Sequence, residues 1–191
     1  TPLVAGTVVA INADDGMRVE RGQLLVQLDP SDTAVALQQA EANLAKTVRQ
    51  TRGLYRSVEG AQADLNARQV TLKRVRDDFA RRKDLAATGA ISNEELAHAR
   101  DELAAAEAAV AGSRETVERN RALVDDTVIA TQPDVQAAAA QLRQAFLNNA
   151  RAGIVAPVSG YVARRSVQVG QRVQPGNALM AVVPTEQMWV E

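Results

Sequence analysis

The sequence contains no cysteine, one histidine, three lysines and few aromatic residues, which make up 3% of its 191 positions. The lack of cysteine excludes disulfides and thiolate metal sites. The scarcity of aromatic residues argues against a thick globular core. Much of the 46% apolar content is alanine, which favours helices and buries little area. No apolar run approaches the roughly 18 residues of a membrane span, and no signal peptide opens the chain.

The net charge of -1 provides no electrostatic field for nucleic acid or acidic lipid, so nucleic acid is not an expected partner. The chain begins and ends in strand-like sequence, Thr1–Val9 and Met188–Glu191. We therefore expect it to be an excerpt of a longer protein, with any membrane anchor or further domain outside it.

Two segments of the chain repeat one another at a constant offset without a gap. Gly6–Pro30 reads GTVVAINADDGMRVERGQLLVQLDP, and Gly160–Pro184 reads GYVARRSVQVGQRVQPGNALMAVVP. The glycines that match between the copies are Gly6, Gly16 and Gly22 with Gly160, Gly170 and Gly176. The expected β-type runs are Leu3–Ile11, Met17–Val19, Leu24–Leu28, Ile154–Val158, Tyr161–Val169 and Leu179–Val183. Neither copy has enough strands to bury a face, so the two are expected to close one small sandwich together.

The segment between the copies has the spacing of a coiled coil. Asp29-Pro30 is a good helix start, because aspartate caps and proline suits the first helical position. Residues seven apart form the expected seam of a first helix over about 30–87, namely Leu37, Leu44, Thr51, Val58, Leu65, Leu72 and Phe79. Residues three positions after seam positions are expected to accompany it, namely Ala40, Leu54, Ala61 and Val75.

A turn and a break interrupt the helical spacing. Gly89 suits the left-handed conformation that follows a helix end, and Ser92 with Glu95 forms a capping box for a second helix. The second seam consists of Leu96, Leu103, Val110, Val117 and Val124, and after a phase slip a new series follows with Val128, Val135 and Leu142. We expect Pro133 to begin a third helical segment and Gly153 to end it.

The chain shows no catalytic constellation. His98, the lone histidine, is interpreted as a solvated helix residue, and no phosphate-binding lysine follows any glycine run. The β repeats resemble the halves of a lipoyl or biotinyl carrier domain, which holds its cofactor on a turn lysine. Lys46, Lys73 and Lys83 all fall in the predicted helices, so neither a cofactor nor a metal is expected.

The whole chain resembles the periplasmic adaptor, or membrane fusion protein (HlyD-like), family of tripartite exporters. Its order of half-motif, helical hairpin and half-motif is that of the family. The run Ala156–Arg165 (APVSGYVARR), the run Asn93–Asp101 (NEELAHARD) and the ending Val182-Val183-Pro184 with Met188-Trp189-Val190 look like the EmrA type. The implied fold is α+β, with a long antiparallel coiled-coil hairpin inserted between the two halves of a lipoyl-like β-sandwich.

The predicted organisation follows this resemblance. Residues 1–29 form the first half-motif and 30–153 the hairpin, with arms at about 30–87 and 93–152, a turn at 88–92 and a break near 125–133. Residues 154–185 form the second half-motif, and 186–191 begin a β-barrel domain.

Family adaptors carry a hairpin-tip motif, Arg-Leu-x-x-Leu followed seven residues later by Ser, which contacts the outer-membrane channel. Arg81, Leu85 and Ser92 match that spacing, whereas Arg82 replaces the first leucine. The docking residues that the resemblance implies are Arg81, Arg82, Leu85, Gly89, Ile91 and Ser92. A purely structural interpretation is also open, in which Ser92 only caps a helix and Leu85 closes the coiled coil.

The resemblance implies a non-enzymatic adaptor between an inner-membrane pump, of the major-facilitator type, and a TolC-like outer-membrane channel. It also implies homo-oligomers, hydrophobic antimicrobial substrates, and a periplasmic location held by an N-terminal anchor. Two alternatives stay open: an adaptor for an ABC-type or type I secretion pump, and a self-associating structural coiled coil. A third, a carrier domain with an inserted coiled coil, is disfavoured by the absence of a lysine in the turn.

Overall fold

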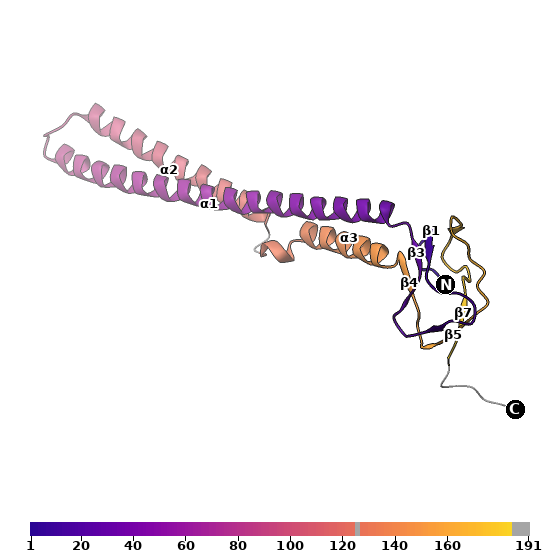
Figure 1. The fold of residues 1–191 in the computed structure, drawn as a ribbon. Helices are drawn as coiled ribbons and strands as arrows, with labels where there is room; N and C mark the ends of the chain where they lie inside the picture. Colours follow the sequence, from indigo (N-terminus) through magenta and orange to yellow (C-terminus); the bar gives the residue numbers. More distant parts are fainter. Residues whose placement is uncertain (125–126, 185–191) are drawn as a thin grey trace. The chain divides into compact units, whose positions relative to one another are not determined.

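The computed structural model describes residues 1–124 and 127–184 (Figure 1). The predicted link into a further domain at 186–191, including Met188–Val190, lies outside the described residues. The chain divides into two compact units. One unit comprises residues 1–45 and 137–191, and the other comprises residues 46–136.

The first unit contains two antiparallel sheets, each built from both halves of the repeat. The first half contributes β1 (Gly6–Ile11), β2 (Arg18–Val19) and β3 (Leu24–Leu28). The second half contributes β4 (Gly153–Val155), β5 (Gly160–Ala163), β6 (Arg172–Val173) and β7 (Ala181–Pro184). One sheet has the order β4-β3-β1-β6 and the other the order β2-β5-β7. Neither half can therefore form either sheet alone, which confirms the predicted mixed fold of hairpin and shared β-sandwich.

Hydrogen bonds between the halves follow the symmetry of the sequence repeat. The Gly16 N–H donates to the Val162 carbonyl at 2.8 Å, and the Gly170 N–H donates to the Val8 carbonyl at 2.8 Å. The Gly22 N–H likewise donates to the Ala156 carbonyl. These bonds satisfy backbone groups at the loops that connect the short strands. The two copies are consequently interlocked rather than merely stacked.

Matched positions of the repeat also fill the core of the sandwich. Val8 and Val162 are both buried, and the same holds for Val19 with Val173 and for Leu25 with Leu179. Their side chains come from opposite halves and remove apolar surface from water together. The buried set that completes this core is Ala13, Val26, Leu28, Ala152, Ala156 and Val167.

The same unit includes the helix ends that adjoin the sheets. Helix α1 (Ser31–Ala87) begins where the Asp29 carboxylate accepts hydrogen bonds from the backbone N–H of Ser31, at 2.9 Å, and from its hydroxyl. The Ser31 bonds hold the pKa of Asp29 below its ordinary value. Helix α3 (Pro133–Ala150) lies beside α1, with Thr33 donating to Asn149 at 3.0 Å. Pro133 begins α3 as predicted. Gly153 does not end it, because the helix stops at Ala150 and Gly153 opens β4.

The second unit contains the rest of α1 and all of α2 (Asn93–Ala122). The predicted seams of α1 and α2 are confirmed, since Thr51, Leu65, Val117 and Val124 are buried and the other seam residues of these two helices are at least partly buried. Leu54 is the exception among the companion positions, at 38% exposed. The part-buried residue there is Tyr55, so the seam shifts by one position where α1 faces the break in the second arm.

The second arm is interrupted by a non-helical segment, and not only by a kink in a continuous helix. Helix α2 ends at Ala122, a 3-10 turn η1 covers Ile129–Thr131, and α3 follows. Val128 is 64% exposed, so the prediction that it resumes the seam is wrong, whereas Val135 is buried as expected. The prediction of a phase slip falls partly on residues 125–126, outside the described residues. Within the described chain, no helix combines the length and apolar character that a membrane crossing requires.

Candidate functional site

The turn between α1 and α2 is closed by a set of backbone hydrogen bonds. Gly89 has φ +74, the left-handed conformation. The Ala90 N–H donates to the Leu85 carbonyl at 3.0 Å, and the Gly89 N–H donates to the Ala86 carbonyl at 3.0 Å. This pairing is the Schellman motif, which satisfies carbonyls that a helix end leaves free. The Thr88 hydroxyl adds a bond to the Leu85 carbonyl at 2.8 Å. The turn is therefore a defined structure at the hairpin tip.

The predicted capping box starts α2. The Ser92 hydroxyl oxygen accepts from the Glu95 N–H at 3.2 Å, and the Glu95 carboxylate accepts from the Ser92 N–H at 2.9 Å. The Ser92 hydroxyl also donates to that carboxylate at 3.1 Å. Hydrogen bonds from the backbone and then the side chain of Ser92 lower the pKa of Glu95, and the Arg82 charge lowers it further. Ser92 thus has a structural role whatever the tip contacts.

The two arginines of the tip motif share one acidic partner. Arg81 and Arg82 both form ion pairs with Asp78, at 3.1 Å and 2.8 Å. Arg82 is part-buried and occupies a companion position of the seam, facing α2, whereas Arg81 is exposed. A shallow groove of about 250 Å³ lies beside them and is also lined by Arg74 and Glu102. The residue pattern alone had not indicated Asp78, although its spacing of three and four residues from the arginines is that of helical ion pairs.

Leu85 does not close the coiled coil. Its side chain is 47% exposed, while Ala86 occupies the part-buried position on the seam. Ile91 is part-buried and Gly89 is exposed. The structure therefore brings the six predicted tip residues together over the last turn of α1, the loop and the cap of α2. One of them, Leu85, has a largely exposed apolar side chain.

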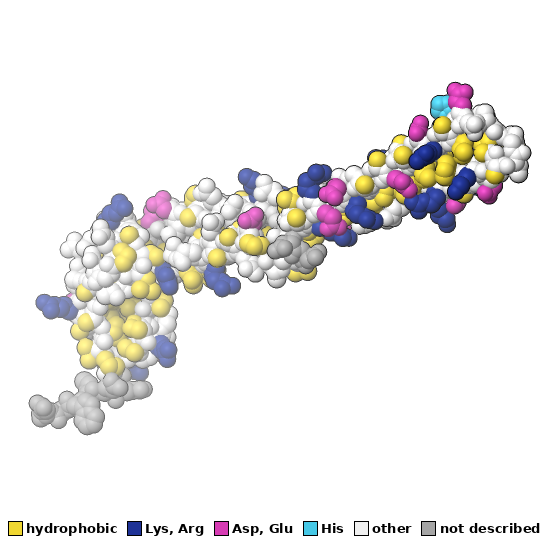
Figure 2. All heavy atoms as spheres, turned by 180° about the vertical axis from the view of Figure 1, so that it is seen from behind, with side chains coloured by type: hydrophobic (Ala, Val, Ile, Leu, Met, Phe, Trp, Pro, Cys, Tyr) yellow, Lys and Arg dark blue, Asp and Glu magenta, His cyan; other side chains and the backbone are white. Residues whose placement is uncertain are grey.

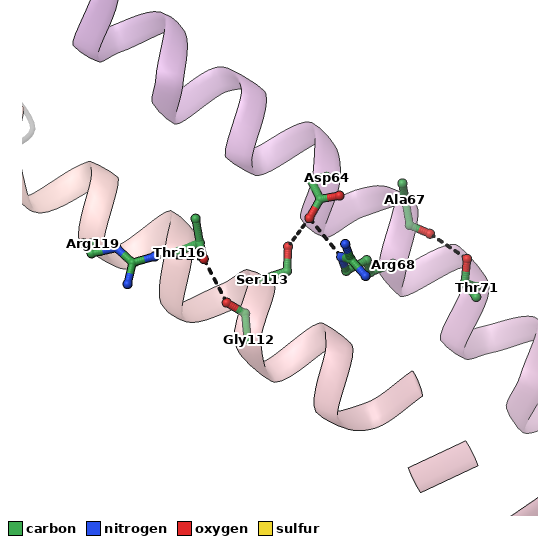
Figure 3. A network of polar contacts seen from close by, with 8 residues as sticks. All are labelled: Asp64, Ala67, Arg68, Thr71, Gly112, Ser113, Thr116 and Arg119. Carbon is green, nitrogen blue, oxygen red and sulfur yellow. Dashed lines mark hydrogen bonds and ion pairs between the residues drawn. The ribbon is translucent and has the colours of Figure 1, made fainter. Parts of the chain in front are cut away.

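A polar contact below the tip fixes the two helices against each other. Ser113 is buried on α2 and donates to the Asp64 carboxylate on α1 at 2.8 Å (Figure 3). Arg68 donates to the same carboxylate at 2.9 Å. The Arg68 bond and then the Ser113 bond lower the pKa of Asp64. A second contact, Arg76 with Glu107 at 2.9 Å, also joins the helices. These contacts specify the register of the hairpin, which apolar seams alone specify weakly.

Charged side chains otherwise alternate along the hairpin surface, with basic and acidic groups interspersed (Figure 2). His98 is exposed and lies 3.9 Å from Glu94, four residues earlier, as expected of a solvated helix residue. Among the described residues, no group of three His, Asp or Glu side chains is placed to hold a metal ion.

The six glycines of the β repeats serve two purposes. Four of them have positive φ in loops, namely Gly16, Gly22, Gly170 and Gly176. The other two lie at close approaches of strands. A Cβ on Gly6 would lie 3.2 Å from the Leu28 Cβ, and one on Gly160 would lie 2.1 Å from the Val183 carbonyl oxygen. All six are accounted for by the fold.

A helical hairpin joined to two interlocked lipoyl-like half-motifs defines the class of the membrane fusion proteins. The family model described as EmrA, alpha-helical hairpin domain, matches residues 31–152, and the chain belongs to this family. It is 42% identical over 188 residues to the multidrug export protein EmrA of Haemophilus influenzae, covering 98% of this chain and 48% of that protein.

A second relative and a solved structure are also similar to the chain. The chain is 42% identical over 192 residues to the fatty acid resistance protein FarA of Neisseria gonorrhoeae, covering 100% of this chain and 49% of that protein. It thus spans about half the length of the curated relatives it matches. A solved structure of the periplasmic adaptor protein EmrA aligns with a TM-score of 0.49 and 18% identity, over 96% of this chain and 71% of that one.

Proposed function

We propose that this chain comprises the helical hairpin and the lipoyl-like domain of a periplasmic adaptor in a tripartite multidrug efflux system. In this role the hairpin tip docks on a TolC-like outer-membrane channel. The lipoyl-like sandwich lies towards an inner-membrane pump of the major-facilitator type, and several copies assemble around the export path. Transport energy comes from the pump, while the adaptor holds the pump and the channel together. Hydrophobic antimicrobials are the proposed substrates.

Membership of the EmrA family supports this role, as do relatives named for multidrug export and for fatty acid resistance. The architecture supports it as well. Helix α1 has 57 residues, which correspond to a contour length of about 85 Å at a rise of about 1.5 Å per residue. A helix of this length suits a spacer between two partners.

The exposed Leu85 is the observation that carries the docking proposal. It lies in the last turn of α1, and its carbonyl accepts three hydrogen bonds that hold the turn. Its side chain is left in solvent beside the charged Arg81. Arginine is enriched among the residues that dominate binding at protein interfaces. An exposed leucine beside it, on a fixed turn, adds apolar surface that a partner can bury. The arginine can reach carbonyl or carboxylate groups on channel helices.

The test is export-dependent drug resistance in cells that carry the full-length protein with Leu85→Asp or Arg81→Ala. Val70→Asp is the matched control, because Val70 lies on the same helix, is 70% exposed and is distant in sequence from the tip. We expect resistance to be lost in the Leu85 variant, reduced in the Arg81 variant and retained in the control. Expression, thermal stability and pump association are measured in parallel. Full resistance in a stably folded Leu85→Asp variant would show that the tip does not dock.

A further inference from the structure

Two hollows with apolar linings lie next to each other in the first unit. The larger has a volume of about 290 Å³ and is lined by Leu147 and Ala150 of α3, by Arg151, and by Gly153, Ile154 and Val155 of β4, together with Thr1 and Leu3. The smaller, of about 110 Å³, is lined by Leu25, Val26, Pro157, Leu179, Met180 and Val182. Both hollows also share Thr1, Ile154 and Val155 as lining residues. The two hollows therefore adjoin each other at β4, and together they are called the depression here.

The depression is apolar along its length and charged at one end. Leu3, Leu147 and Val155 leave much of their side-chain surface exposed in it, and Val155 is 50% exposed. Arg151 lines the larger hollow only. Among the described residues, none forms an ion pair or side-chain hydrogen bond with the Arg151 guanidinium. The larger hollow thus combines an apolar lining with an arginine that has no acidic partner among the described residues.

We propose that this depression binds a single-chain amphipathic carboxylate. The carboxylate pairs with Arg151, since guanidinium and carboxylate match as a bidentate pair. The alkyl chain lies over Ile154 and Val155 towards Met180 and Val182. A volume of about 290 Å³ is near the lower end of ordinary ligand pockets, which favours one narrow chain over a bulky ligand. This site is separate in sequence from the hairpin tip and does not depend on channel docking.

Dodecanoate is the probe, measured by isothermal titration calorimetry with the 191-residue chain below the micelle concentration. We expect saturable binding of one dodecanoate per chain. Dodecyltrimethylammonium, which has the same tail and the opposite charge, should bind at least tenfold more weakly. Arg151→Gln should weaken dodecanoate binding about tenfold or more. Arg143→Gln is the matched control, because Arg143 is an exposed arginine on α3, which ends directly before Arg151, and lies outside both hollows.

Val155→Asp tests the tail position independently, because Val155 lines both hollows and its exposed side chain can be replaced with the fold intact. It should reduce binding at least tenfold without lowering the melting temperature appreciably. Sedimentation of the ligand-free wild type and of this variant tests whether a second copy of the chain occupies the depression instead. Dissociation of a dimer by Val155→Asp would show that a second copy covers the depression and would overturn the proposal. Non-saturable binding, or equal affinity of wild type, Arg151→Gln and Val155→Asp, would overturn it as well.

Discussion

Gly160 and its equivalent in the first half of the repeat both lie where a neighbouring strand comes close, but the atoms that they face differ. Its equivalent, Gly6, faces the Leu28 side chain, which can shift by a few tenths of an ångström. Gly160 instead faces the backbone of Val183 and Pro184 on the neighbouring strand, with which it pairs in the second sheet. A side chain cannot be accommodated there without separating β5 from β7. The same residue type at matched positions of a repeat therefore has different physical causes.

Gly160→Ala is expected to destabilise the sandwich by about 3 kcal/mol or more, because the new Cβ would overlap the Val183 carbonyl and force the strands apart. Gly176→Ala is the comparison. Gly176 has φ +90 and no neighbouring atom within 4 Å of the place that a Cβ would occupy, so only the left-handed backbone costs energy, about 1–2 kcal/mol. Urea unfolding measures both. Equal costs would show that the β5–β7 contact is looser than described.

Ser92→Ala should lower the stability of the hairpin by about 1 kcal/mol, the usual cost of losing an N-cap. Glu95→Gln tests the charge of the same capping box. The pKa of Glu95 is lowered in the folded state, first by the Ser92 backbone bond, so its ionised form stabilises the fold at neutral pH. This contribution is present above the unfolded pKa, near 4.5, and is lost as the pH falls through the folded pKa.

The stability difference between wild type and Glu95→Gln is therefore expected to be largest at pH 7 and to vanish at strongly acidic pH, where wild-type Glu95 is protonated. Urea unfolding at several pH values measures this difference. A difference that does not change with pH would mean that the carboxylate charge contributes nothing to the cap.

At the scale of elements, the break in the second arm is held by side chains of the first. The Tyr55 hydroxyl on α1 donates to the Thr127 carbonyl, which lies beyond the end of α2. The Gln132 amide donates to the Val124 carbonyl at 2.6 Å. The Val124 and Thr127 carbonyls, which follow α2, thus accept hydrogen bonds from side chains of α1 and of the segment before α3. Pro133 then begins a new helix. These contacts explain why Tyr55 replaces Leu54 on the seam.

Tyr55→Phe is expected to cost about 1 kcal/mol, because the Thr127 carbonyl loses its partner while the ring can still pack. Tyr161→Phe is the matched control. Tyr161 is exposed on β5, and among the described residues its hydroxyl has no hydrogen-bond partner. Removing that hydroxyl should change stability by less than about 0.5 kcal/mol. Urea unfolding followed by circular dichroism measures both variants, and equal costs would exclude a role for the Tyr55 hydroxyl in holding the break.

At the scale of the whole molecule, the hairpin is a long insertion between halves that fold only together. Both sheets contain strands from before and after it. The two arms must therefore contribute matching lengths, and the contacts of Ser113 with Asp64 and of Arg76 with Glu107 indicate which segments face one another. Residues 71–77 and 103–109 lie in such facing segments and contain both members of the Arg76–Glu107 pair.

Deleting 71–77 and 103–109 together removes one heptad from each arm and preserves the seams and the facing register. We expect this double deletion to unfold cooperatively with nearly unchanged helix content per residue. Deleting 71–77 alone leaves one arm a heptad longer and should give a less cooperative, less stable protein. Circular dichroism with urea compares the two. In full-length protein, the double deletion shortens each helix by about 10 Å and should abolish drug resistance if the hairpin acts as a spacer.

The sequence was sufficient for features that depend on local chemistry or on a regular period. The repeat indicated two halves of one sandwich because matched valines and glycines at a constant offset need matched partners. The heptads indicated a hairpin, Ser92 with Glu95 indicated its cap, and Pro133 indicated the start of the third helix. Each of these signals acts within one or two turns of chain or repeats along it.

Only the tertiary structure decided which side chains of the two arms face one another. Leu54 fits the heptad spacing but is exposed, because the second arm is interrupted between α2 and α3 and Tyr55 contacts the interrupting segment instead. Val128 is exposed because it lies in that segment, outside both helices. Leu85 does not close the coiled coil and is also exposed, because Ala86, seven residues after Phe79, is the residue on the seam there. The depression beside β4 joins residues far apart in the sequence, and no period in the chain marks it. Contacts between distant segments depend on packing, which a pattern along one segment does not contain.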